Sequence, residues 1–103
     1  MNEEIRSLID IDRTIHEPAR LMIVAVLSAV AEADFLYLLN ATALTKGNLS
    51  AHLSRLEEAG YVAIEKTFVG KTPRTVARLT AAGAAALEDY RKQLRSVVDG
   101  DIM

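Results

Sequence analysis

The side chains best suited to polar recognition lie in residues 44–62, LTKGNLSAHLSRLEEAGYV. On a helix that turns by about 100° per residue, Leu49, Leu53 and Leu56 fall on one stripe. This stripe predicts a helix over residues 46–59 that is buried on its leucine side. Gly60 follows at the place where a glycine commonly ends a helix.

The opposite face of this predicted helix is small and polar. Gly47, Ala51 and Ser54 carry short side chains, so a flat or grooved partner could approach the backbone closely. Donors flank these small residues, a combination typical of helices that enter the major groove of DNA. We therefore expect the base edges to be read by Asn48, Ser50, Ala51, Ser54 and Arg55, with Ala51 against a thymine methyl group.

A second group of basic residues follows in the turn cluster GKTPR, residues 70–74. The flanking runs, 61–69 and 75–80, are rich in β-branched residues and predict two strands. Lys71 and Arg74 would then lie at the tip of a hairpin, within reach of a phosphate or the minor groove. The expected phosphate and hairpin contacts are Thr45, Lys46, Lys66, Lys71, Thr72 and Arg74.

The distribution of charge supports an anionic partner for the middle of the chain. The net charge is −2, but residues 42–80 hold six basic and three acidic residues, a balance of +3. The rest of the chain therefore carries −5. A basic middle with acidic ends predicts that one surface faces an anion and that the ends serve another purpose.

The remaining patterns predict a mainly helical α+β fold in one domain, 1–103. Helices are expected over 3–15, 17–30, 35–41, 46–59 and 81–98, with Asp34, Thr45 and Thr80 as helix caps. The helix over 17–30 is apolar on most sides and should be central in the core. The domain thus divides into an N-terminal helix (1–15), core helices with a two-stranded hairpin (17–80) and a C-terminal helix (81–98).

The two terminal helices carry apolar residues that predict a homodimer. Leu87, Tyr90, Leu94 and Val97 follow the 3-4-3 spacing of a coiled-coil seam. With Ile5, Leu8 and Ile9 they form more apolar surface than a small helical core can cover. The seam could instead pack on the N-terminal helix of the same chain, and we favour the dimer.

Composition and motifs argue against several other classes. The chain has no cysteine, and residues 21–31, its longest apolar stretch, are too short to span a bilayer. The acidic start, MNEEIRSLIDID, is unlike a secretory signal, so we expect a cytoplasmic protein. No catalytic motif or cofactor fingerprint is present, and no enzyme activity is expected. His16 with Asp10, Asp12 and Glu17 lacks the spacing of a metal site, so no metal is expected.

The run ALTKGNLSAHLSRLEEAGYVAIEKTFVGKTPRTVARLTAAGAAALEDY resembles the winged-helix DNA-binding domains of small MarR-like transcriptional regulators. The resemblance extends over residues 17 to about 90. It implies a dimeric regulator that binds double-stranded DNA, with residues 46–59 as recognition helix and residues 66–75 as wing. A winged helix that binds another protein is the alternative, and no residue pattern points to a particular small-molecule effector.

Overall fold

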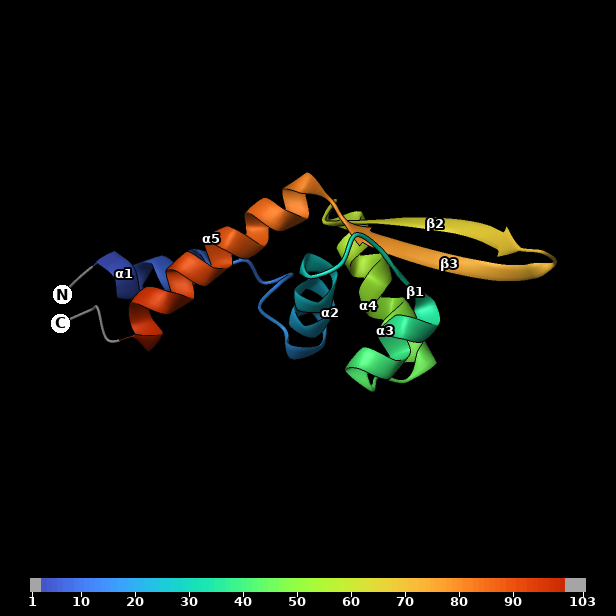
Figure 1. Ribbon diagram of the computed structural model, residues 1–103. Helices are drawn as coiled ribbons and strands as arrows, with labels where there is room; N and C mark the ends of the chain where they lie inside the picture. Colours follow the sequence, from blue (N-terminus) through green and yellow to red (C-terminus); the bar gives the residue numbers. More distant parts are fainter. Residues whose placement is uncertain (1–2, 100–103) are drawn as a thin grey trace.

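The computed structural model describes residues 3–99. Short helices α1 (Glu3–Arg6) and η1 (Ser7–Asp10, a 3₁₀ helix) come first. The central part comprises α2 (Pro18–Ser28), β1 (Ala33–Asp34), α3 (Phe35–Thr42) and α4 (Lys46–Glu58). The chain continues with β2 (Val62–Val69), β3 (Thr72–Leu79) and α5 (Ala81–Val98). Figure 1 shows α2, α3 and α4 at the base of the β2–β3 hairpin, with α5 extending in the opposite direction beside α1. The predicted α+β winged-helix fold is confirmed.

Each of the longer helices begins at a side chain that caps it, as the local sequence predicts. The Glu17 carboxylate accepts a hydrogen bond from the Arg20 N–H at the start of α2, where Pro18 needs no partner. The remaining caps follow the same geometry, with Asp34 accepting from Tyr37 N, Thr45 from Asn48 N and Thr80 from Gly83 N. Within residues 3–99, no helix is both long enough and apolar enough to cross a bilayer.

The main core forms where α2, α3 and α4 meet the base of the sheet. Its fully buried side chains include Ile23 and Leu27 of α2, Leu38 of α3, and Leu49 and Leu56 of α4. Burying a leucine or isoleucine side chain stabilises a fold by about 1.5–3 kcal/mol. The prediction that α2 lies centrally, with the α4 leucines turned inward, is therefore confirmed.

The sheet has three antiparallel strands in the order β1-β3-β2, whereas the sequence predicts two. Pairing between β2 and β3 runs from Val62–Leu79 to Val69–Thr72, which leaves a two-residue turn at Gly70 and Lys71. Gly70 has φ +64°, as the first central residue of a type II′ turn requires. The predicted five-residue turn, 70–74, is thus wrong. Pro73 fits inside β3 because it lies beyond the β1 pairing, where no neighbour needs its missing N–H.

The predicted N-terminal helix over 3–15 ends early. Helical structure stops at Asp10, and the carboxylate of Asp12 accepts hydrogen bonds from the N–H groups of Thr14 and Ile15. Such side-chain acceptors compete with the helix for backbone donors. The turn buries Ile11 and Ile15 against Tyr90 of α5, in a second apolar cluster.

Polar contacts attach this N-terminal turn to distant parts of the chain. The Tyr61 hydroxyl donates to Asp12, and His16 Nδ1 lies 2.9 Å from the Tyr90 hydroxyl. Asp12, His16 and Glu17 therefore have structural partners. Among residues 3–99, no three His, Asp or Glu side chains come together in a way that would hold a metal ion.

The start of α5 presses directly on the chain that enters β2. The Thr80 N–H donates to the Tyr61 carbonyl at 3.0 Å, and the Thr80 hydroxyl donates to the Gly60 carbonyl at 2.6 Å. A Cβ on Gly83 would overlap the Tyr61 carbonyl oxygen and lie 2.8 Å from Leu79 Cδ1. Only glycine therefore fits at position 83.

We expect Gly83→Ala to lower the free energy of unfolding by about 1–3 kcal/mol because the added methyl group overpacks this contact. Alanine favours a helix by up to about 1 kcal/mol over glycine, so the steric effect must exceed that gain. The matched control is Gly47→Ala in α4, where a Cβ would meet no atom within 4 Å and which should gain stability. Urea unfolding of both variants tests this, and a gain for both would contradict it.

The hydrogen bond to Asp12, partial burial and the charge of Asp12 raise the pKa of Tyr61 from 10.0 to about 12. The folded state therefore holds the phenol proton more tightly than the unfolded state. The resulting stabilisation is complete below pH 10 and is lost as the pH rises through 12. The difference in phenolate absorbance between the natural protein and Tyr61→Phe should have its midpoint near pH 12, and Asp12→Asn should move it lower. A midpoint near pH 10 in the natural protein would show that the contact is absent in solution.

Candidate nucleic-acid interface

The outward face of α4 is open to solvent. Its leucine side is buried, while Asn48, Ser50, Ala51, Ser54 and Arg55, the predicted base-reading residues, are all exposed, together with Gly47. The small residues leave the backbone of α4 accessible over its first two turns. This face can therefore approach a surface closely and present hydroxyl, amide and guanidinium donors to it.

The helix-turn-helix geometry is fixed by hydrogen bonds around the turn between α3 and α4. The buried Thr42 hydroxyl donates to the Leu38 carbonyl at 2.7 Å and accepts from the Leu44 N–H at 3.3 Å. Ala43 ends α3 with a φ of +58°, a left-handed conformation that is uncommon for alanine. The exposed Thr45 then caps α4, and Lys46 lies exposed beside the free N–H groups of its first turn.

A groove of about 430 Å³ separates α4 from the hairpin. Donors from both elements line it, with Ser50 and Ser54 from α4 and Lys66 and Thr75 from the strands. Glu57 also lines the groove and is its acidic member. A strand of nucleic acid that follows this groove would meet hydroxyl groups on one side and an ammonium group on the other.

The hairpin presents its basic residues differently from the prediction. Lys71 and Thr72 are exposed at the tip, but Arg74 lies within β3, and its Nε is 3.5 Å from the Asp34 carboxylate. Arg74 therefore joins the hairpin to the start of α3, and Asp34 offsets part of its charge. The tip also exposes two apolar side chains, Phe68 and Val69, at 67% and 63%. The sequence patterns predicted no function for that pair.

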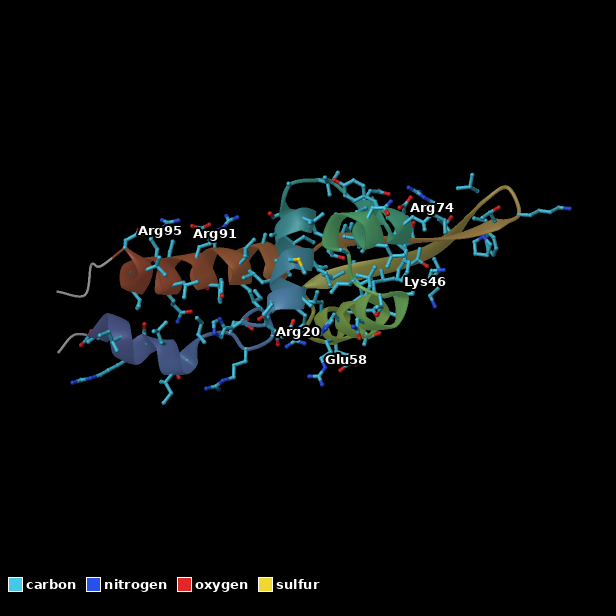
Figure 2. All side chains as sticks on the ribbon, turned by 90° about the horizontal axis from the view of Figure 1, so that it is seen from below. Arg20, Lys46, Glu58, Arg74, Arg91 and Arg95 are labelled. Carbon is cyan, nitrogen blue, oxygen red and sulfur yellow. The ribbon has the colours of Figure 1, made fainter. Side chains whose placement is uncertain are left out.

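A second cleft, of about 760 Å³, lies beside the C-terminal half of α4. Arg55 of α4 lines it together with Arg13 and Arg20, and Glu58 is its acidic member. Figure 2 shows Arg20 and Glu58 side by side there. Sequence reasoning missed Arg13 and Arg20 because no local spacing connects them with α4.

The predicted dimer residues separate into two groups. Leu87 and Tyr90 are 4% and 5% exposed and are buried by their own chain. These two side chains complete the core and offer no surface to a partner, which corrects the prediction for them. Ile9 is exposed, Ile5 is at the edge of exposure, and Leu8, Leu94 and Val97 are half-buried. Val98, which was not predicted, is exposed at the end of α5.

Comparison with known proteins identifies relatives of this chain. A family model described as winged helix DNA-binding domain matches residues 19–98. An uncharacterised protein of Methanocaldococcus jannaschii is 35% identical over 71 residues, which cover 69% of this chain and 77% of that protein.

Solved structures share the fold over nearly all of the chain. A transcriptional regulator homologue from Pyrococcus horikoshii OT3 superposes with a TM-score of 0.87 at 29% identity, covering 99% of this chain and 100% of that one. A mutant MarR from E. coli, complexed with operator DNA, superposes with a TM-score of 0.72 at 18% identity, covering 96% of this chain and 71% of that one. At this identity the similarity is one of fold alone. The solved structures that share its fold include a transcriptional regulator homologue and MarR, and the chain belongs to the winged helix DNA-binding domain family.

Proposed function

We propose that the protein is a homodimer that binds double-stranded DNA at specific sequences and regulates transcription in the cytoplasm. The observation that carries the proposal is the exposed face of α4, small and rich in donors, beside a groove that leads to a basic hairpin. Helix α4 would enter the major groove, and residues 66–75 would contact the backbone or the minor groove.

The proposed base contacts come from the exposed side of α4. Asn48 and Arg55 suit adenine and guanine edges, since an amide and a guanidinium can each make two hydrogen bonds to one base. Ser50 and Ser54 add adaptable hydroxyl groups, and Ala51 would contact a thymine methyl group. Because Gly47 and Ala51 are short, these donors can reach the floor of the groove.

The proposed phosphate contacts surround this face. Thr45 and Lys46 lie at the start of α4, Lys66 lies in the groove, and Lys71 and Thr72 lie at the hairpin tip. Arg74 would contribute less, because Asp34 already neutralises part of its charge. These contacts fix the register of the protein on DNA and carry no sequence information themselves.

The proposed dimer forms through α1, η1 and the last turns of α5. Ile5, Leu8, Ile9, Leu94 and Val97 remain from the original set, and the exposed Val98 extends it, whereas Leu87 and Tyr90 serve the core. A two-fold axis at this end would place two α4 helices about 34 Å apart, one turn of DNA. Such a dimer would read a pseudo-palindromic site.

A winged helix that binds a protein partner is the second candidate. The exposed Phe68 and Val69 at the hairpin tip favour it, since an apolar pair is common at protein interfaces. The overall charge of −2 favours it as well. The two candidates differ in their response to salt, because a DNA complex releases counterions and weakens steeply as salt rises.

The first test is a titration of the protein with random-sequence duplex DNA at about 50 and 200 mM salt, over which a protein with several phosphate contacts loses orders of magnitude in affinity. The mass in solution is measured in parallel. A steep loss from a two-chain species supports the proposal. An absence of binding at low salt would overturn it in favour of a protein partner.

After selection of a preferred site, Arg55→Ala should cost about 1–3 kcal/mol on particular base pairs and relax specificity there. Lys71→Ala should weaken binding to all sequences alike and lower the salt slope by about 1. Competition between the selected site and single-base variants of it measures both effects. Equal losses of specificity from the two substitutions would contradict the division between base and phosphate contacts.

A further inference from the structure

The cleft beside α4 carries an excess of positive charge. Three guanidinium groups line it, from Arg13, Arg20 and Arg55, against the single carboxylate of Glu58. Its formal charge is therefore +2, in a chain whose net charge is −2. Among the described side chains, the ion pairs are Arg74 with Asp34 and Arg91 with Glu88. None of the three cleft arginines has a carboxylate partner in that set.

Arg20 is held in position by neutral acceptors. Its Nε donates to the Thr14 carbonyl at 2.6 Å, and its Nη2 donates to the Arg13 carbonyl at 3.3 Å. Its Nη1 lies 3.2 Å from His52 Nδ1. Because a guanidinium only donates, this histidine nitrogen must be the acceptor. The charge of Arg20 is thus fixed in place, and no carboxylate of the described residues lies within ion-pair distance of it.

Arg20 also keeps donors for a ligand. A guanidinium has five N–H groups, and three of those on Arg20 contact acceptors among the described residues. Arg13 is steadied as well, since its Nη2 donates to the Ile9 carbonyl at 3.4 Å. The Thr14 side chain adds a hydroxyl group to the lining.

The lining selects the chemistry of the ligand. Its one apolar member is Ala59, so the cleft has no wall on which an aromatic ring or an aliphatic body would be buried. Guanidinium groups match the tetrahedral oxygens of phosphate and bind them through paired hydrogen bonds. A compact, doubly charged oxyanion therefore fits the cleft better than an organic carboxylate with a large apolar part.

We propose that this cleft is a phosphate-binding site, made by Arg13, Arg20 and Arg55 between the N-terminal turn, α2 and α4. Arg55 also belongs to the exposed face of α4, so the site adjoins the surface that we assign to DNA. The phosphate group can come from the backbone of DNA bound at α4, a source that rests on the proposed function; Arg13 and Arg20 then hold it while Arg55 contacts a base. It can instead come from a free phosphorylated small molecule, which all three arginines hold. In the second case, the ligand and DNA compete for Arg55.

The first experiment needs no DNA. Inorganic phosphate, and then pyrophosphate, is titrated into the full chain while the backbone amide resonances are followed by NMR. Saturable shifts confined to residues around Arg13, Arg20 and Arg55 support a free-phosphate site. Glu58→Gln should then tighten binding about twofold to fivefold, because it removes the one opposing charge. Arg13→Ala should weaken binding. Arg91→Ala, which removes a charge from α5 away from the cleft (Figure 2), should bind as the natural protein does.

The second experiment measures duplex DNA binding by the same variants. If the phosphate is that of the backbone, Arg13→Ala lowers the salt slope by about 0.9. The factor by which its DNA affinity falls below that of the natural protein should then shrink about threefold to fourfold between 50 and 200 mM salt. Sequence preference should not change, and Arg91→Ala should keep the natural slope.

The two experiments distinguish a failure of this site from a failure of the proposed function. Local shifts with phosphate, in a protein that binds no DNA, would keep the site and overturn the function. The opposite result has two parts: Arg13→Ala and Glu58→Gln leave DNA binding unchanged, and saturating pyrophosphate causes no local shifts. That result would overturn the site and keep the function. Circular dichroism and urea unfolding of each variant exclude loss of fold as the cause.

Discussion

The close contact between α5 and the backbone at Tyr61 is the constraint on which the arrangement of the whole molecule depends. The Tyr61 carbonyl accepts the Thr80 N–H, and the missing side chain of Gly83 lets the helix approach that same carbonyl. The Tyr61 hydroxyl in turn donates to Asp12, whose carboxylate shapes the turn before α2. One residue thus fixes the hairpin, the terminal helix and the N-terminal turn relative to one another.

None of these anchoring residues belongs to the surface assigned to DNA. The helix α4 shows the same separation on a smaller scale, with Leu49, Leu53 and Leu56 buried and the opposite side free of packing. Different side chains therefore stabilise the fold and form the surface proposed to bind DNA. Arg55 is an exception within α4, because it lies on the recognition face and also lines the arginine cleft.

Features set by neighbouring residues could be predicted from the sequence. The helix starts at Glu17-Pro18, Asp34, Thr45 and Thr80 depend on hydrogen bonds that span three residues, and all four are found. The leucine stripe of α4 is likewise a matter of local spacing. The hairpin was predicted, but its register was not. Phe68 pairs with Pro73 inside the hairpin, whereas a proline is usually expected in the turn.

Features that join distant residues escaped prediction. Asp12 and Tyr61 are 49 positions apart, and His16 and Tyr90 are 74 apart, so no periodicity could connect them. The spacing of Leu87 and Tyr90 was read as a seam between chains, although the N-terminal turn of the same chain covers Tyr90. For the candidate site, the exposed face of α4 could be predicted from sequence. The arginine cleft could not, since three separate segments form it.

The described chain begins and ends in the same place. Helix α1 contacts α5 at the end of the molecule that points away from the hairpin, as Figure 1 shows. A covalent link between α1 and the last turns of α5 would therefore close almost the whole described chain into a ring, with little distortion of the folded state. Closing a loop of about 100 residues removes roughly 4.7 kcal/mol of entropic advantage from an unfolded chain. The wing and α4, at the other side of the ring, would keep their surfaces free.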